Sequence, residues 1–291
     1  MQIAVLKYDL KRGIYFTLLS ALSYSTTHLL AIFVLDRFSL FQLFFLQNLI
    51  AFIFLTPFLS VRSAHWKIHL VRSLSGSLGG CFILLALKTL NLVDVMTLNH
   101  LFPFLVAILG FWWLNEPVAK YAWLAIAFGF IGTLVILNPT WNFFHLGGIF
   151  ALGSALTSAI SFTAVRSLNL KGEPPERILT YLFATGIVVS FPFTVHHWVQ
   201  PHLHEWTLFL LSGILAFLNQ IFVVKAFKCA PAHTITPFGY ASIVFAMMFN
   251  WLFLGRPMKP ESIFGSFLIG VGALLICLLK QKKKQNEIIS S

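Results

Sequence analysis

The sequence predicts an all-α membrane protein with ten transmembrane helices in two inverted five-helix repeats. Three observations lead to this fold class: the composition, the length of the apolar runs, and a repeat that contains an odd number of helices. The chain of 291 residues is 58% hydrophobic and only 10% charged, and its mean hydropathy is +0.85. Because a soluble domain usually carries about a quarter charged residues, a water-soluble enzyme with a large core is a poor explanation.

Ten apolar stretches are long enough to cross a bilayer, which takes about 20 apolar residues in a helix. The runs are continuous and do not alternate in polarity, so a membrane β-barrel is disfavoured. Their approximate bounds are 13–33, 39–60, 73–90, 93–114, 119–137, 147–166, 177–195, 206–226, 232–254 and 262–280.

The net charge of +11 would suggest nucleic acid in a soluble protein, but here Lys and Arg lie between apolar runs and indicate topology. With a cytoplasmic N-terminus, sixteen of them fall inside, Arg72 and Arg166 among them. Four fall outside, namely Arg37, Lys88, Arg256 and Lys259. The positive-inside rule therefore predicts cytoplasmic termini in a bacterial inner membrane, and no nucleic-acid partner is needed.

Two parts of the chain align without a gap. "WWLNEPVAK" from Trp112 corresponds to "LFLGRPMKP" from Leu252 at an offset of 140 residues. Upstream, "SALSYS" from Ser20 resembles "SALTSA" from Ser154 at an offset of 134. The chain therefore contains two copies of one five-helix unit.

These copies divide the chain into a first repeat, 1–138, a second repeat, 147–280, and a basic cytoplasmic tail, 281–291. The tail is expected to anchor at the anionic inner leaflet, with binding to a partner as the alternative. Five crossings are an odd number, so the second repeat enters the membrane from the opposite side, as in many secondary transporters. Glu116 and Arg256 then end corresponding helices on opposite faces, and neither has to be buried.

Polar side chains recur at helical spacing in several of the predicted spans. Such groups are costly in hydrocarbon and turn toward a wet cavity or the bundle interior. Small Ser, Thr and Gly residues are better explained by close helix packing. The larger groups are the predicted solute-binding residues, namely Tyr24, His28, Asn99, His100, Asn219, Gln220 and Tyr240.

The two histidines of this set could exchange a proton near neutral pH and couple transport to a proton gradient. The alternative is a neutral ring held by a hydroxyl or carbonyl of the next helix. We favour that alternative for His28 and leave both explanations open for His100. Nearby, Pro103 removes a backbone hydrogen bond and can kink its helix.

The two five-helix halves resemble the two EamA domains of the drug/metabolite transporter superfamily. The resemblance is carried by "HLFPFLVAILGFWWLNEP" from His100 and "AFKCAPAHTITPFGYASIVFAMMFNWLFLGRP" from Ala226. In that family the fourth helix of a half carries a proline and ends near a glutamate, which Pro103 and Glu116 match. The second half departs from the pattern with Ile243 and Arg256, so a role of the glutamate is not carried over to it.

The resemblance implies a secondary transporter of a small metabolite, such as an amino acid or a nucleotide-like solute like S-adenosylmethionine, working by alternating access in contact with membrane lipid. The alternatives are an intramembrane enzyme acting on a lipid-soluble substrate and a non-transporting sensor. No acidic pair or H-E-x-x-H lies in a span, and no phosphate-binding G-x-x-x-x-G-K motif is present. Three cysteines match no metal site, so no cofactor or metal is expected. Whether the chain forms a homodimer is left open.

Overall fold

The computed structural model describes residues 9–116, 120–137, 146–255, 260, 263–265, 267–268 and 270–272. Every regular element in this part of the chain is a helix. Arg256, Cys277 and the tail 281–291 lie outside the described residues. The elements are α1 (Leu10–Leu35), α2 (Leu40–Leu55), η1 (Thr56–Phe58), α3 (Trp66–Leu87), α4 (Leu92–Asn99), α5 (Phe102–Leu114), α6 (Lys120–Leu137), α7 (Leu146–Leu170), α8 (Pro175–His196), α9 (Leu203–Cys229), α10 (Ala232–Ile235), η3 (Thr236–Tyr240) and α11 (Ala241–Leu254).

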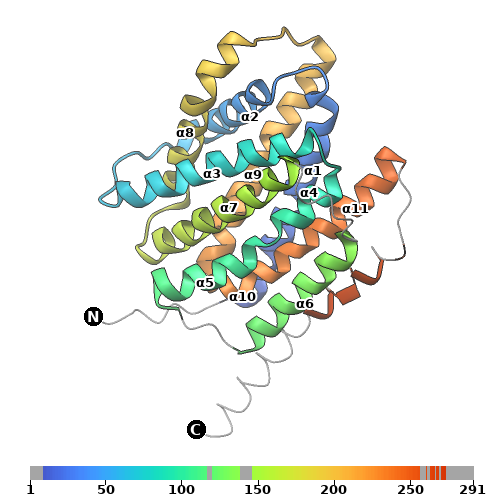
Figure 1. The fold of residues 1–291 in the computed structure, drawn as a ribbon. Helices are drawn as coiled ribbons and strands as arrows, with labels where there is room; N and C mark the ends of the chain where they lie inside the picture. The colour runs from blue at the N-terminus through green and yellow to red at the C-terminus, as the bar shows by residue number, and fades with distance from the viewer. Residues whose placement is uncertain are drawn as a thin grey trace, which may run out of the picture.

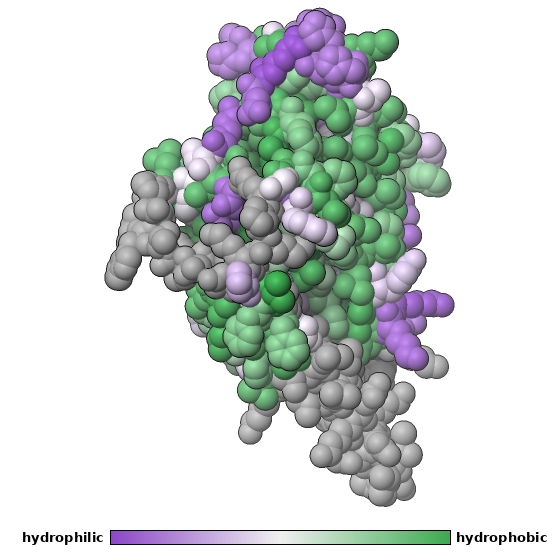
Figure 2. Space-filling model, turned by 90° about the vertical axis from the view of Figure 1, so that its right-hand side faces the viewer, coloured by the Kyte–Doolittle hydropathy of each residue, from purple (hydrophilic) through white to green (hydrophobic). Residues whose placement is uncertain are grey.

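Eight segments of the described chain are helical, long and apolar enough to span a membrane, counting α4 with α5 and α10 with α11 as one span each. Helix α6 corresponds to the predicted stretch 119–137, of which the structure describes 120–137. The predicted stretch 262–280 lies largely outside the described residues, although parts of 263–272 are helical. Figure 2 shows the surface these helices create, with hydrophobic side chains across its middle and hydrophilic ones gathered at its top.

Repeat-related helices end in the same way. Asn115, after α5, and Gly255, after α11, both adopt a left-handed backbone, with φ of 51° and 62°. In each case the backbone N–H bonds five residues back, from Asn115 to Gly110 and from Gly255 to Asn250. This is a common way to satisfy the last carbonyl groups of a helix. The sequence repeat at offset 140 thus includes a repeated helix stop.

The main helix pairs each join one helix of the first half to one of the second. Helix α1 lies along α9, and α3 lies along α7 (Figure 1). In the sequence repeat α1 corresponds to α7 and α3 to α9, so the two pairs are equivalent. Helix α2 packs on α8, its own counterpart. The seam between the halves therefore runs through the middle of the bundle.

Two corresponding spans are interrupted at this seam. The first breaks between α4 and α5 at His100 and Leu101, and the second passes from α10 through η3 into α11. Pro103 lies in the first turn of α5, and Pro237 in the first turn of η3. Neither proline has an N–H to continue the helical ladder, so the kink predicted at Pro103 takes the form of a full break.

Candidate functional site

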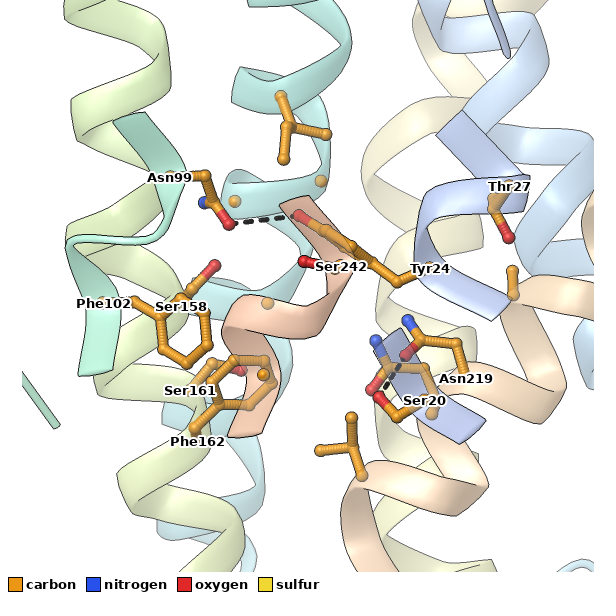
Figure 3. Close-up of a pocket in the computed structure, with 18 of the residues that line it drawn as sticks. Ser20, Tyr24, Thr27, Asn99, Phe102, Ser158, Ser161, Phe162, Asn219 and Ser242 are labelled. Carbon is orange, nitrogen blue, oxygen red and sulfur yellow. Dashed lines mark hydrogen bonds between the residues drawn. The ribbon is translucent and has the colours of Figure 1, made fainter. Parts of the chain in front are cut away.

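A central cavity of about 180 Å³ lies where the two interrupted spans meet. Helices of both halves form its wall, and Figure 3 shows their polar side chains pointing into it. Six of the seven predicted solute-binding residues line it: Tyr24, His28, Asn99, His100, Asn219 and Gln220.

Tyr240 is the predicted residue that the cavity wall does not include. Its side chain is only 1% exposed and packs against α6, where a Cβ added to Gly129 would lie 2.4 Å from the Tyr240 ring. Its neighbours Gly239 and Ser242 face the cavity instead. The short η3 turn rotates Tyr240 away from the position of its repeat partner, His100.

Hydrogen bonds across the cavity join helices within the first half and also helices of the two halves. Ser20 on α1 donates to Asn219 Oδ1 on α9 at 2.8 Å, and Tyr24 donates to Asn99 Oδ1 at 3.2 Å (Figure 3). Asn99 Nδ2 in turn donates to Ser154 Oγ on α7 at 2.9 Å. The small serines, for which packing is the simpler explanation from sequence, thus both pack and line the cavity.

The two histidines of the wall have different surroundings. The His100 Nδ1 lies 2.6 Å from the Met96 carbonyl, and its Nε2 lies 2.7 Å from Ser242 Oγ. His28 is buried with its ring 4.4 Å from the Tyr24 ring in an edge-on contact. Its Nδ1 has no hydrogen-bond partner among the described residues. Hydroxyl and carbonyl partners from the other half, Ser242 and Gly239, are therefore present at His100, whereas the described residues offer none to Nδ1 of His28, the histidine for which such a partner was the favoured explanation.

Arg72 is a wall residue that the sequence pattern does not reveal, because Arg72 comes before the predicted span 73–90. Helix α3 begins at Trp66 instead. Arg72 is 1% exposed and lines the cavity, where its guanidinium donates to Ser161 Oγ and, at 2.6 Å, to Gln220 Oε1. The helical register of Arg72 with Gly76 was the available signal, because residues four apart share a face.

Glu116 and Arg166 form a second group that the sequence reasoning placed wrongly at the surface. Helix α7 continues to Leu170, so Arg166 is fully buried. Its Nε and Nη2 both donate to Glu116 Oε1, at 2.8 and 2.7 Å, and its Nη1 donates to the Phe227 carbonyl at 3.0 Å. Glu116 therefore neutralises a charge from the other half.

The cavity is equipped to bind a solute. Among its described lining residues, Arg72 is the only one of the four strongly ionising types Lys, Arg, Asp and Glu. Most of the other polar groups are hydroxyls and amides, which can donate or accept hydrogen bonds. The described residues contain no cluster of three His, Cys, Asp or Glu side chains that could hold a metal ion.

A chamber lined by polar and apolar side chains, lying between paired halves of a helical bundle and faced by two interrupted spans, is the arrangement of a membrane transport protein. The sequence profile of the EamA-like transporter family matches residues 11–138 and 145–278. The chain therefore belongs to this family, and the predicted ten-helix fold with repeats is confirmed.

Individual relatives agree with this membership. The chain is 28% identical over 214 residues to the pseudopaline exporter CntI of Pseudomonas aeruginosa, covering 73% of this chain and 75% of the relative. It is 23% identical over 286 residues to the S-adenosylmethionine uptake transporter of Rickettsia bellii, covering 95% and 97%. One crystal structure shares the fold, with a TM-score of 0.78, 19% identity, and coverage of 94% of this chain and 99% of that chain.

Proposed function

We propose that this transporter is a secondary carrier that moves a small metabolite across the cytoplasmic membrane by alternating access. The observation that carries the proposal is the meeting of the two interrupted spans at one polar cavity, through the contacts of His100 with Gly239 and Ser242. A break in a span frees the two helical pieces to tilt separately. Two such pieces related by an inverted repeat can exchange shapes, which opens the same cavity first to one side and then to the other.

The proposed repeats are 1–138 and 147–280, and both termini lie in the cytoplasm. Sixteen Lys and Arg inside against four outside support this orientation. Arg72 and Arg166 are buried in the bundle, but without them fourteen Lys and Arg still fall inside against four outside. A reporter enzyme fused after Ser291 tests it: activity confined to the periplasm would reverse the orientation.

The solute is proposed to be an amino acid or a nucleotide-like metabolite. The likeness to the S-adenosylmethionine uptake transporter supports the second class. The relatives do not assign a direction of transport, because another relative at similar identity is an exporter.

Vesicles that contain only this chain test the carrier proposal. A panel of radiolabelled amino acids and nucleosides, with S-adenosylmethionine included, is offered with and without a proton gradient. We expect at least one solute to accumulate and to be recovered chemically unchanged. Recovery of an altered compound would instead support the enzyme alternative, and no movement of any solute under either condition would contradict a carrier.

A further inference from the structure

The Arg72 guanidinium is a buried positive charge on the cavity wall without a carboxylate beside it. Its two hydrogen-bond acceptors, Ser161 Oγ and Gln220 Oε1, are both neutral. The Nε atom has no hydrogen-bond partner in the described part of the chain. Among the described residues, no ion pair includes Arg72.

The nearest comparison within this chain is Arg166, which is also fully buried. Arg166 is paired with Glu116 at 2.7 Å, as is usual for charges removed from water. An unpaired buried charge is strongly unfavourable. Arg72 therefore occupies a position in which an added anion would be stabilising, whereas Arg166 does not.

The chain is also shaped to hold the Arg72 guanidinium where it is. A Cβ added to Gly76, one turn along α3, would lie 2.5 Å from Arg72 Nη1 and 3.0 Å from Ser161 Oγ. Glycine at this position leaves the room that the guanidinium fills. The amide of Gln220 and the hydroxyl of Ser161 then fix its direction from α9 and α7.

We propose that Arg72 binds a carboxylate group of the transported solute, so that the substrates are small metabolites that carry a carboxylate. This inference rests on the carrier function proposed above. A guanidinium pairs well with a carboxylate through two parallel N–H donors, and the unsatisfied Nε supplies one of them. One positive charge balances one carboxylate, whereas a phosphate monoester carries about −1.5 to −2 at neutral pH and would leave excess charge in the cavity.

The opposite end of such a solute meets apolar side chains. The rings of Phe102 and Phe162 pack edge to face with centroids 5.1 Å apart, and both line the cavity beside Ser161 (Figure 3). A carboxylate at Arg72 would place an attached apolar or planar group against these rings. The cavity therefore suits an amphiphilic acid better than a small, uniformly polar one.

Matched pairs of probes test the assignment on the purified full chain in lipid nanodiscs. The pairs are phenylalanine with phenethylamine, and S-adenosylmethionine with its decarboxylated form. A third arm, adenosine monophosphate with adenosine, tests for phosphate. Ligand binding raises the unfolding temperature, and we expect at least one carboxylate to do so with affinity at least tenfold above its decarboxylated partner.

Two variants identify the residue responsible. Arg72→Gln should abolish the tenfold preference for the carboxylate, and Arg12→Gln, which alters an arginine whose side chain is 78% exposed, should preserve it. If Arg72→Gln does not fold, Arg72→Lys and Gly76→Ala take its place, and each should weaken the preference while keeping the charge. Equal binding within both carboxylate pairs, preference for the phosphate, or an unchanged preference in the variants would overturn the assignment.

The same probes separate this inference from the carrier proposal. Carboxylate-selective binding without movement across vesicles would leave Arg72 as an anion site and remove the carrier function. Transport of phenethylamine as fast as phenylalanine, unaffected by Arg72→Gln, would leave the carrier and remove the role of Arg72.

Discussion

His100 and Ser242 join the two interrupted spans through a 2.7 Å contact between Nε2 and Oγ. The two residues come from corresponding breaks, because Ser242 is the repeat partner of Phe102, two residues beyond His100. The His100 Nδ1 donates to the Met96 carbonyl at 2.6 Å. With Nδ1 alone protonated, Nε2 accepts from the serine hydroxyl, whereas a ring protonated at both nitrogens also donates to the Gly239 carbonyl, 3.0 Å from Nε2. A single side chain thus connects the interrupted spans of both halves.

Removal of this connection should destabilise the protein. We expect His100→Leu to lower the free energy of unfolding by about 1–3 kcal/mol, because Ser242 and the Met96 carbonyl lose a partner in a buried place. Thermal or denaturant unfolding in detergent measures the change. His28→Leu is the matched control, since the buried His28 Nδ1 has no partner to lose within the described chain. An equal effect of both substitutions would mean that the His100 contacts contribute little.

The buried ion pair between Glu116 and Arg166 gives a second prediction. Glu116→Gln leaves a fully buried guanidinium without its carboxylate, which costs about 3 kcal/mol. Replacing both residues, as Glu116→Gln with Arg166→Met, removes the charge as well and should recover part of that loss. A double-mutant cycle on unfolding free energies measures the coupling between the two side chains.

The pair Arg37–Glu205 is the control for this cycle, because its cation is exposed to solvent. The Arg37 side chain is 42% exposed and that of Glu205 11%, with Arg37 Nη1 2.6 Å from Glu205 Oε1. Pairs with solvent-exposed partners contribute about 0.2–1 kcal/mol, so Arg37→Gln should cost less than Glu116→Gln. Similar costs would show that the buried position of Arg166 does not govern the strength of its pairing.

The sequence was sufficient for most of the spans, the repeat and six residues of the cavity wall, because these depend on local hydropathy and helical spacing. Tyr24, Asn99 and Asn219 could be found because large polar groups in a span have few places to go. The register of η3 could not be found, since one short turn rotates Tyr240 from the cavity to α6. In that position the Tyr240 ring fills the space that Gly129, far away in the sequence, leaves open.

The misplaced arginines have a different physical reason. A positive charge near the end of an apolar run is usually a marker of the membrane surface, and Arg72 and Arg166 fit that pattern in sequence. Whether such an arginine lies at the membrane surface or within the helical bundle is decided by its partners. These are Gln220 for Arg72 and Glu116 for Arg166. These partners are 148 and 50 residues away, so no local pattern reveals them.

Glycines at close contacts provide a third prediction. Gly129→Ala should destabilise the protein by about 1–3 kcal/mol, the usual effect of overpacking, since the new methyl group would overlap the Tyr240 ring. Gly110→Ala should instead be neutral or stabilising by up to about 1 kcal/mol, because alanine favours a helix and nothing lies within 4 Å of its Cβ. In unfolding curves, the midpoint of Gly129→Ala should therefore fall clearly, whereas the midpoint of Gly110→Ala should stay the same or rise.

A cluster around Glu173, at the ends of α3 and α8, gives a fourth prediction, which concerns the pH dependence of stability. Burial raises the pKa of Glu173, but hydrogen bonds from Ser63 and Arg177, with the nearby His69 ring, outweigh it and hold the pKa below its ordinary value of 4.5. Arg177 Nη1 lies 2.8 Å from Glu173 Oε2, and His69 Nε2 lies 3.4 Å from it. The ionised carboxylate is thus favoured in the folded protein.

The sign of the effect follows from this lowered pKa. The stabilisation is fully present above the unfolded pKa of 4.5 and is lost as the pH falls through the lower folded value, because the unfolded chain binds the proton first. Unfolding measured from neutral pH down to about 3 should show this loss in the native protein. Glu173→Gln should be less stable at neutral pH and should lose less on acidification, whereas Glu176→Gln should follow the native curve. A Glu173→Gln protein with the native acid response would show that another carboxylate causes it.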